Sequence, residues 1–110
     1  MNTDASRQYL AMKRNLPYPH PGEILQHEFL VPLEVSPYRL AKAIGVPQGR
    51  IGQIIAGQRS ISADTALRLA RYFGTSDTFW LMLQSQYDAA MARDAIGEEL
   101  LGIEPLQRVA

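Results

Sequence analysis

The segment from Leu40 to Ala56 contains two short sets of regularly spaced apolar residues, separated by a glycine and a proline. The first set has helical spacing and includes an alanine small enough to let a second helix cross closely: Leu40, Ala41 and Ile44. Gly45 stands where this helix must end, because glycine tolerates the left-handed backbone of a helix C-cap. Pro47 fits the first turn of a following helix, where its missing N–H is not needed.

The second set also has helical spacing and consists of Ile51, Ile54 and Ile55. Two short helices joined by so tight a turn form a helix-turn-helix, whose second helix enters the major groove of DNA. The segment therefore predicts double-stranded DNA as a partner. Because such units bind as dimers on two half-sites, we expect a homodimer on a palindromic operator.

Caps and terminators elsewhere complete an all-α pattern. Ser36 and Ser62 are suited to open helices, and Gly57 and Gly74 to end them. The expected helices span 21–30, 37–44, 47–56, 63–73 and 77–93. The fourth helix is expected to bury Leu67, Ala70 and Phe73. We predict a five-helix repressor-like bundle over 20–94, with a flexible N-terminal arm over 1–19. The acidic tail over 95–110 is expected to be irregular and is a possible dimerisation element.

Charge is sorted along the chain, although the 11 basic and 11 acidic residues balance. Residues 35–63 carry four bases and no acid, whereas residues 77–110 carry six acids and two bases. The basic block coincides with the helix-turn-helix, and this coincidence favours a nucleic-acid partner more than the net charge opposes it.

The second helix of the motif separates into two faces at 100° per residue. The side opposite the isoleucines and its flanks carry the candidate base-reading residues Gln48, Gly49, Arg50, Gly52 and Gln53. Arginine pairs with guanine and glutamine with adenine. Each glycine costs a helix about 1 kcal/mol relative to alanine. Two interpretations are open: the glycines are tolerated in a weak helix, or they leave a bare face that enters the groove deeply.

Four polar residues within 35–63, the segment without acidic residues, are the candidate phosphate contacts: Ser36, Arg39, Lys42 and Arg59. The basic side chains could equally be an ordinary solvated surface. Ser36 could instead serve only as a helix cap, and Ser60 and Ser62 carry the same ambiguity.

Several other classes are disfavoured. The chain has no cysteine, so thiolate chemistry and disulfides are excluded. His27 and Glu28 begin a helical zinc motif, but its second histidine would fall at Val31. We therefore expect no metal, no cofactor and no enzyme activity. The longest apolar run, 79–83, is far too short for a membrane span, and the first 20 residues lack a secretory segment. A cytoplasmic protein is expected.

Three motifs narrow the interpretation: His20-Pro-Gly-Glu-Ile-Leu25, Ala63-Asp-Thr-Ala-Leu-Arg-Leu-Ala-Arg-Tyr-Phe-Gly-Thr75 and Phe79-Trp-Leu-Met-Leu-Gln84. Together with the helix-turn-helix, and in this order over residues 20 to about 88, they resemble HigA-type addiction-module antitoxins. The resemblance implies an antitoxin that represses its own operon. It also implies a small, basic RelE/HigB-like toxin that cleaves mRNA as the protein partner.

Two features of the sequence predict the surfaces for these partners: acidic residues that suit a basic toxin, and apolar residues in excess of what the core needs. Toxin contact is assigned to the arm and first helix, with Leu16, Tyr18, Glu23 and Glu28, and the acidic C-terminal region is the alternative. Dimerisation is assigned to the fifth helix and tail, with Trp80, Tyr87, Leu100, Leu101 and Ile103. Trp80 could instead be a core residue that seals the bundle.

Two other readings stay open. The chain could be a solitary transcriptional regulator without a toxin, or an interaction module that has lost DNA binding. The intact motif and its acid-free basic block disfavour the second.

Overall fold

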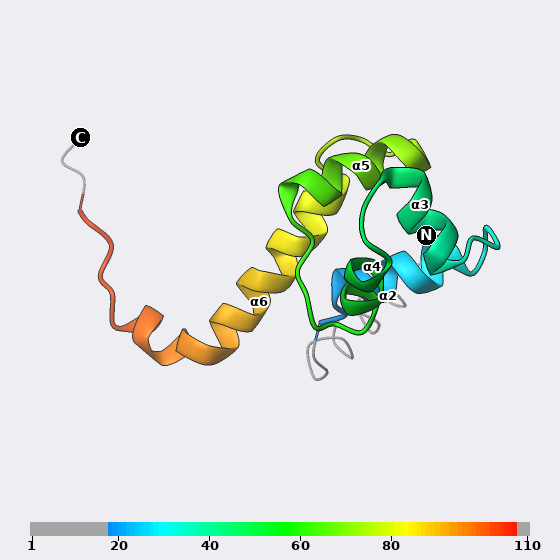
Figure 1. Cartoon of the computed structure of the whole chain (residues 1–110). Helices are drawn as coiled ribbons and strands as arrows, with labels where there is room; N and C mark the ends of the chain where they lie inside the picture. Colours follow the sequence, from blue (N-terminus) through cyan, green and yellow to red (C-terminus); the bar gives the residue numbers. More distant parts are fainter. Residues whose placement is uncertain (1–17, 108–110) are drawn as a thin grey trace, which may run out of the picture.

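The computed structural model describes residues 18–107, in which helices are packed into a bundle and one long helix runs out of it (Figure 1). The elements are α2 (Pro21–Ile24), the π-helical η1 (Leu25–Leu30), α3 (Pro37–Ile44), α4 (Gln48–Ile55), α5 (Ala63–Phe73) and α6 (Phe79–Leu101). α2 and η1 form one continuous rod, which is the first expected helix. No strand occurs among residues 18–107, so the expected five-helix, all-α bundle is confirmed.

Local capping residues set most helix ends. The Oγ of Ser36 accepts a hydrogen bond from the N–H of Arg39 at 3.0 Å and opens α3. Ser62 opens α5 in the same way through the N–H of Thr65. α3 ends at Gly45, which is left-handed with φ 73° as expected. Pro47 is the N-cap of α4 rather than its first helical residue, because its ψ of 140° is extended.

The core is formed by one apolar side of each helix. Its largest fully buried side chains include Leu25, Leu40, Ile51, Ile54, Leu69 and Trp80. Full burial of one such side chain contributes about 1.5–3 kcal/mol. Phe29 of η1 lies against Phe73 of α5 and Trp80 of α6, with ring centroids 5.0 and 4.8 Å apart. This aromatic cluster joins the first helix to the last two.

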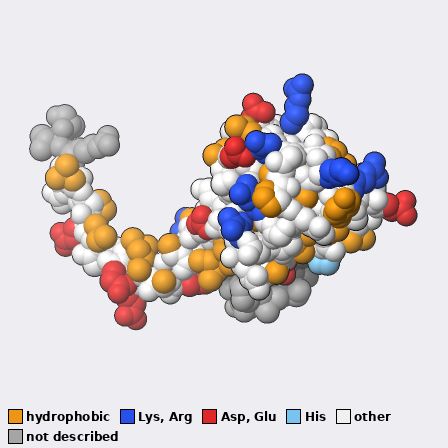
Figure 2. Space-filling model, viewed as in Figure 1, with side chains coloured by type: hydrophobic (Ala, Val, Ile, Leu, Met, Phe, Trp, Pro, Cys, Tyr) orange, Lys and Arg blue, Asp and Glu red, His pale blue; other side chains and the backbone are white. Residues whose placement is uncertain are grey.

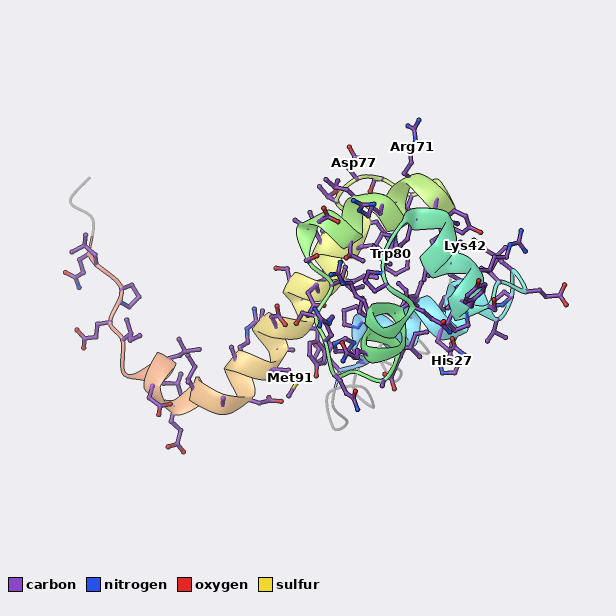
Figure 3. The ribbon with its side chains drawn as sticks, viewed as in Figure 1. His27, Lys42, Arg71, Asp77, Trp80 and Met91 are labelled. Carbon is purple, nitrogen blue, oxygen red and sulfur yellow. The ribbon has the colours of Figure 1, made fainter. Side chains whose placement is uncertain are left out.

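Trp80 settles one of the alternatives raised by the sequence. Its side chain is 0% exposed and lies within the helices of the bundle (Figure 3). It therefore has no surface to offer a second subunit, and its assignment to a dimer contact is wrong. The apolar surplus of this helix arises because Phe79, Trp80 and Leu83 all pack on the bundle.

The expected core stripe of α5 is partly wrong. Leu67 is 49% exposed, whereas Ala66, Leu69 and Ala70 are buried. The buried side of α5 is therefore displaced by one residue from the expected one. Small Ala66 allows close packing there, whereas Leu67 lies on a more open side of the helix, near Ile44 and Tyr72.

α6 is longer than expected. The apolar pattern predicts an end near Arg93, but the helix continues to Leu101 with a non-helical residue at Ile96 (φ −122°, ψ 21°). Its second half leaves the bundle, as Figure 1 shows, and no side chain from Met91 to Leu101 is buried. Burial periodicity therefore gives no signal there, and the expected irregular tail begins only after this helix. No helix among residues 18–107 is long and apolar enough to cross a membrane.

Candidate nucleic-acid interface

The helix-turn-helix is built by α3, a three-residue turn and α4. The turn is closed by a hydrogen bond from the N–H of Val46 to the carbonyl of Ala41 at 3.0 Å. Val46 is itself buried, which anchors the turn in the core. α4 then packs through Ile51 and Ile54, both 0% exposed, while Ile55 is half-buried. The predicted inward face is therefore confirmed.

The opposite face of α4 is open. Gln48, Gly49, Gly52 and Gln53 are exposed, and Arg50 is half-buried at the flank. A Cβ added at Gly49 or Gly52 would meet no atom within 4 Å. Packing among the described residues therefore does not require glycine at either position. The result is a helix surface on which the backbone itself is accessible between polar side chains.

Gln53 is held in place by a residue outside its helix. The Nε of Arg59 donates to Oε1 of Gln53 at 2.8 Å. This bond orients the amide, so that the Nε2 donor is directed away from the guanidinium. The structure thus joins two residues that the sequence assigned separately, one to bases and one to phosphates.

The basic side chains of α3 lie on its exposed side. Arg39 and Lys42 are exposed, and Lys42 is labelled on α3 in Figure 3. The Nζ of Lys42 lies 5.8 Å from the ring centroid of Tyr38. Tyr38, 56% exposed, was not singled out from the sequence, although its position in the first turn of α3 was available as a signal. The Ser36 hydroxyl accepts the capping bond, as one of the two interpretations required.

Charge is partly separated in space, as it is along the chain. Figure 2 shows most of the visible Lys and Arg side chains over the bundle, where some Asp and Glu side chains also lie, whereas Asp and Glu predominate along the outer part of α6. Such a separation favours approach of a polyanion to the bundle rather than to the projecting helix.

Two further residues that the sequence did not identify as positioning groups hold the motif. Arg68 of α5 donates through Nη1 to the carbonyl of Ile44 at 2.7 Å and through Nε to Asp64 at 2.7 Å. It therefore ties α5 to the last carbonyl of α3. The spacing of Asp64 and Arg68, four residues apart on one helix, was the available signal.

The other is Gly22 of α2, which crosses α4 at the backbone. A Cβ built there would lie 2.6 Å from the carbonyl carbon of Ile54 and 3.0 Å from the Cα of Ile55. Only glycine permits this approach, which fixes α4 on the side opposite its open face.

His20 opens α2, as its position before a proline indicated. Its Nδ1 accepts a hydrogen bond from the N–H of Gly22 at 3.0 Å, and its ring packs in a T-shaped arrangement with that of Tyr87, with centroids 5.0 Å apart. Burial lowers the pKa of His20 below 6.5, although the carboxylates of Glu23 and Asp88 act in the opposite direction. The neutral imidazole is thus the form that caps the helix. No cluster of metal-ligating side chains occurs in the described part of the chain.

The residues assigned to protein partners are only partly brought together. Tyr18, Glu23 and Glu28 are exposed at the first helix, whereas Leu16 lies outside the described residues. Tyr87 is half-buried beneath His20. At the other end of the molecule the exposed residues are Leu100, Leu101 and Ile103.

The packed α3–α4 pair and the open face of α4 define the class of helix-turn-helix proteins, and the family model described as Helix-turn-helix matches residues 28–80. Virulence-associated protein I of Dichelobacter nodosus is 51% identical over 82 residues, which cover 74% of this chain and 76% of that protein. Antitoxin HigA-1 of Vibrio cholerae is 34% identical, over 77% of this chain and 80% of that protein.

The fold agrees with a solved member of the same group. The structure titled Pseudomonas aeruginosa antitoxin HigA with higBA promoter superimposes with a TM-score of 0.76 at 49% identity. The alignment covers 81% of this chain and 98% of that one. The chain belongs to the HigA antitoxin family of helix-turn-helix proteins.

Proposed function

We propose that this chain binds operator DNA through the outer face of α4 and represses the operon that encodes it and a toxin. The observation that carries this proposal is the open face itself, where Gly49 and Gly52 expose the helix backbone between polar side chains. The HigA structure with promoter DNA, at 49% identity, supports the same use of the fold.

We assign recognition of the DNA bases to the side chains of Gln48, Arg50 and Gln53. Arginine can form two hydrogen bonds with guanine, and glutamine can form two with adenine, in the major groove. Because neither glycine carries a side chain, the helix axis can lie closer to the base edges. Even a short side chain at these positions would hold the helix farther away. Gln53 enters this contact already oriented by Arg59.

Phosphate contacts fall to Arg39, Lys42 and Arg59, which are exposed on and next to the motif. Ser36 could add a hydroxyl, although it already caps α3. Contacts of this kind set the register on the duplex and supply most of the sequence-independent affinity.

Dimerisation falls to the outer half of α6 and the segment that follows it. With Trp80 in the core, the available apolar side chains are the exposed ones of this helix and of the segment after it: Met91, Ile96, Leu100, Leu101 and Ile103. Two copies joined there would present their motifs to half-sites about one DNA turn apart.

The toxin is proposed to dock on the arm and first helix. Tyr18 supplies an exposed aromatic ring there, and Glu23 and Glu28 supply charge complementary to a basic RelE/HigB-like toxin. The acidic outer half of α6 is the alternative docking surface. It is the second choice because that part of α6 is already assigned to the dimer.

The experiment is co-expression of the full chain with the product of the neighbouring gene, followed by co-purification and mass spectrometry. We expect a complex with a small basic protein and, for the antitoxin alone, a dimer mass in light scattering. The same purified protein should retard a duplex taken from upstream of its own gene. DNA retardation without a co-purified toxin would instead identify a solitary regulator, and a variant lacking residues 1–19 that retains the toxin would exclude the arm.

A further inference from the structure

The segment 56–62, which joins α4 to α5, is held to α6 by one buried hydrogen bond. The backbone N–H of Ile61 donates to Oε1 of Gln84 at 2.8 Å. Ile61 is 3% exposed and Gln84 is 6% exposed. A buried backbone N–H is costly when it lacks an acceptor, so this bond holds the segment in one position.

Asp88 determines which end of the Gln84 amide faces the segment. Oδ1 of Asp88 accepts from Nε2 of Gln84 at 2.9 Å, one helical turn further along α6. Because the amide donor is used by this carboxylate, the amide oxygen is directed toward Ile61. Gln84 and Asp88 thus form an oriented pair rather than a chance contact.

The held segment carries Arg59, two residues before Ile61. Arg59 reaches back to α4, where its Nε donates to Gln53 at 2.8 Å. A series of contacts therefore runs from α6 through Gln84 and Ile61 to the outer face of α4. Arg59 and Gln53 are exposed, so their placement depends on the backbone from which they project.

We propose that Gln84 is a positioning residue for DNA binding. It fixes the backbone near Ile61, and thereby places Arg59 where its guanidinium orients Gln53. The same guanidinium would meet a phosphate of the bound DNA. The inference rests on the proposed function, since it assumes that Arg59 contacts DNA. It also gives a specific role to the last residue of the Phe79–Gln84 motif.

The first test replaces Gln84 by methionine in the full chain, which removes the amide and keeps the side-chain length. Two probes are used: a duplex of random sequence at low salt, and a duplex from upstream of the chain's own gene. At a temperature where circular dichroism shows the variant folded, we expect about fivefold weaker binding to both, as for one lost hydrogen bond. The slope of log K against log salt should flatten by about 1 per subunit, as for Arg59→Ala.

A double variant separates positioning from general destabilisation. If Gln84 acts through Arg59, Arg59→Ala combined with Gln84→Met should bind no more weakly than Arg59→Ala alone. Additive losses, or unchanged binding by folded Gln84→Met, would overturn the proposal. Gln86→Met makes the same chemical change on the exposed side of α6 and is the matched control.

A charge exchange keeps the proposal testable if Gln84→Met does not fold. Gln84→Glu places two carboxylates one turn apart, and we expect it to weaken binding. Gln84→Glu combined with Asp88→Asn restores the donor and acceptor with the native net charge, and it should recover binding. A double variant that binds no better than Gln84→Glu would refute the positioning role.

The outcomes also separate this inference from the proposed function. If Arg59→Ala weakens binding and folded Gln84→Met does not, only the role of Gln84 is wrong. If Arg50→Ala, Gln53→Ala and Arg59→Ala all leave binding to both probes unchanged, DNA reading by α4 is wrong.

Discussion

Gly22 lies against the carbonyl group of Ile54, so that α2 and α4 meet backbone to backbone. No side chain separates the two helices at this point, and the reading helix is braced from behind by the helix that opens the bundle. A Cβ at Gly22 would force one backbone to move, because neither partner is a flexible side chain.

Gly22→Ala should therefore destabilise the fold by about 1–3 kcal/mol, the usual cost of overpacking. The measurement is the urea midpoint of unfolding. Gly97→Ala is the matched control, because a Cβ there meets nothing within 4 Å. A Gly22→Ala midpoint equal to that of the native chain would show that the crossing is looser than described.

Gly49→Ala and Gly52→Ala should separate the two interpretations of the glycines in α4. Each has open space for a methyl group, so each should stabilise the helix by up to about 1 kcal/mol. If the bare face enters the major groove, each should at the same time weaken operator binding. Thermal melting and a gel-shift titration on the same samples decide. Raised stability with unchanged affinity would mean that the glycines are merely tolerated.

Arg50→Ala and Gln53→Ala should each weaken operator binding by about 1–3 kcal/mol and relax base preference. The reason is their position on the flank and outer face of α4. Titration against a panel of single-base operator variants measures both effects. An affinity and a preference that both stay native would remove that residue from the base-reading set.

Lys42→Ala and Arg59→Ala should both weaken binding to every sequence, and only Lys42→Ala should weaken it to all sequences alike. Each lost phosphate contact should flatten the slope of log K against log salt by about 1, and a dimer doubles the change. Arg59 also orients Gln53, so its variant should show some loss of base preference that Lys42→Ala does not. A native salt slope in Lys42→Ala would return that residue to the ordinary solvated surface.

His20 should make the fold less stable in mild acid. Burial lowers its folded pKa below 6.5, so the unfolded chain takes up a proton first as the pH falls through that value. The folded state, which needs neutral Nδ1 as the acceptor for Gly22, is then disfavoured. The measurement is the melting temperature between about pH 8 and pH 5. It should decrease as the pH falls below 6.5. His20→Asn keeps an acceptor without titrating, and its curve should fall less.

The sequence by itself determined the features that depend on a few neighbouring residues. Ser36, Gly45 and Ser62 cap or end helices because each satisfies backbone groups within four positions of itself. The isoleucine face of α4 follows from the same local geometry, since 3.6 residues per turn place Ile51 and Ile54 together. These signals were sufficient to predict the helix-turn-helix and the exposed candidates for DNA contact.

Only the tertiary structure decided which surfaces meet. That Leu67 is exposed, that Trp80 is buried and that Gly22 contacts Ile54 depends on how helices distant in sequence cross. The outer half of α6 escaped prediction because none of its side chains is buried against the rest of residues 18–107, so it carries no burial pattern. Gln84 is a polar residue in an apolar stretch, and nothing nearby in the sequence indicates a partner for its amide oxygen. The tertiary structure supplies one by placing the N–H of Ile61, 23 residues earlier, beside it. Such pairings lie outside local periodicity because close packing in the core, rather than spacing along the chain, selects them.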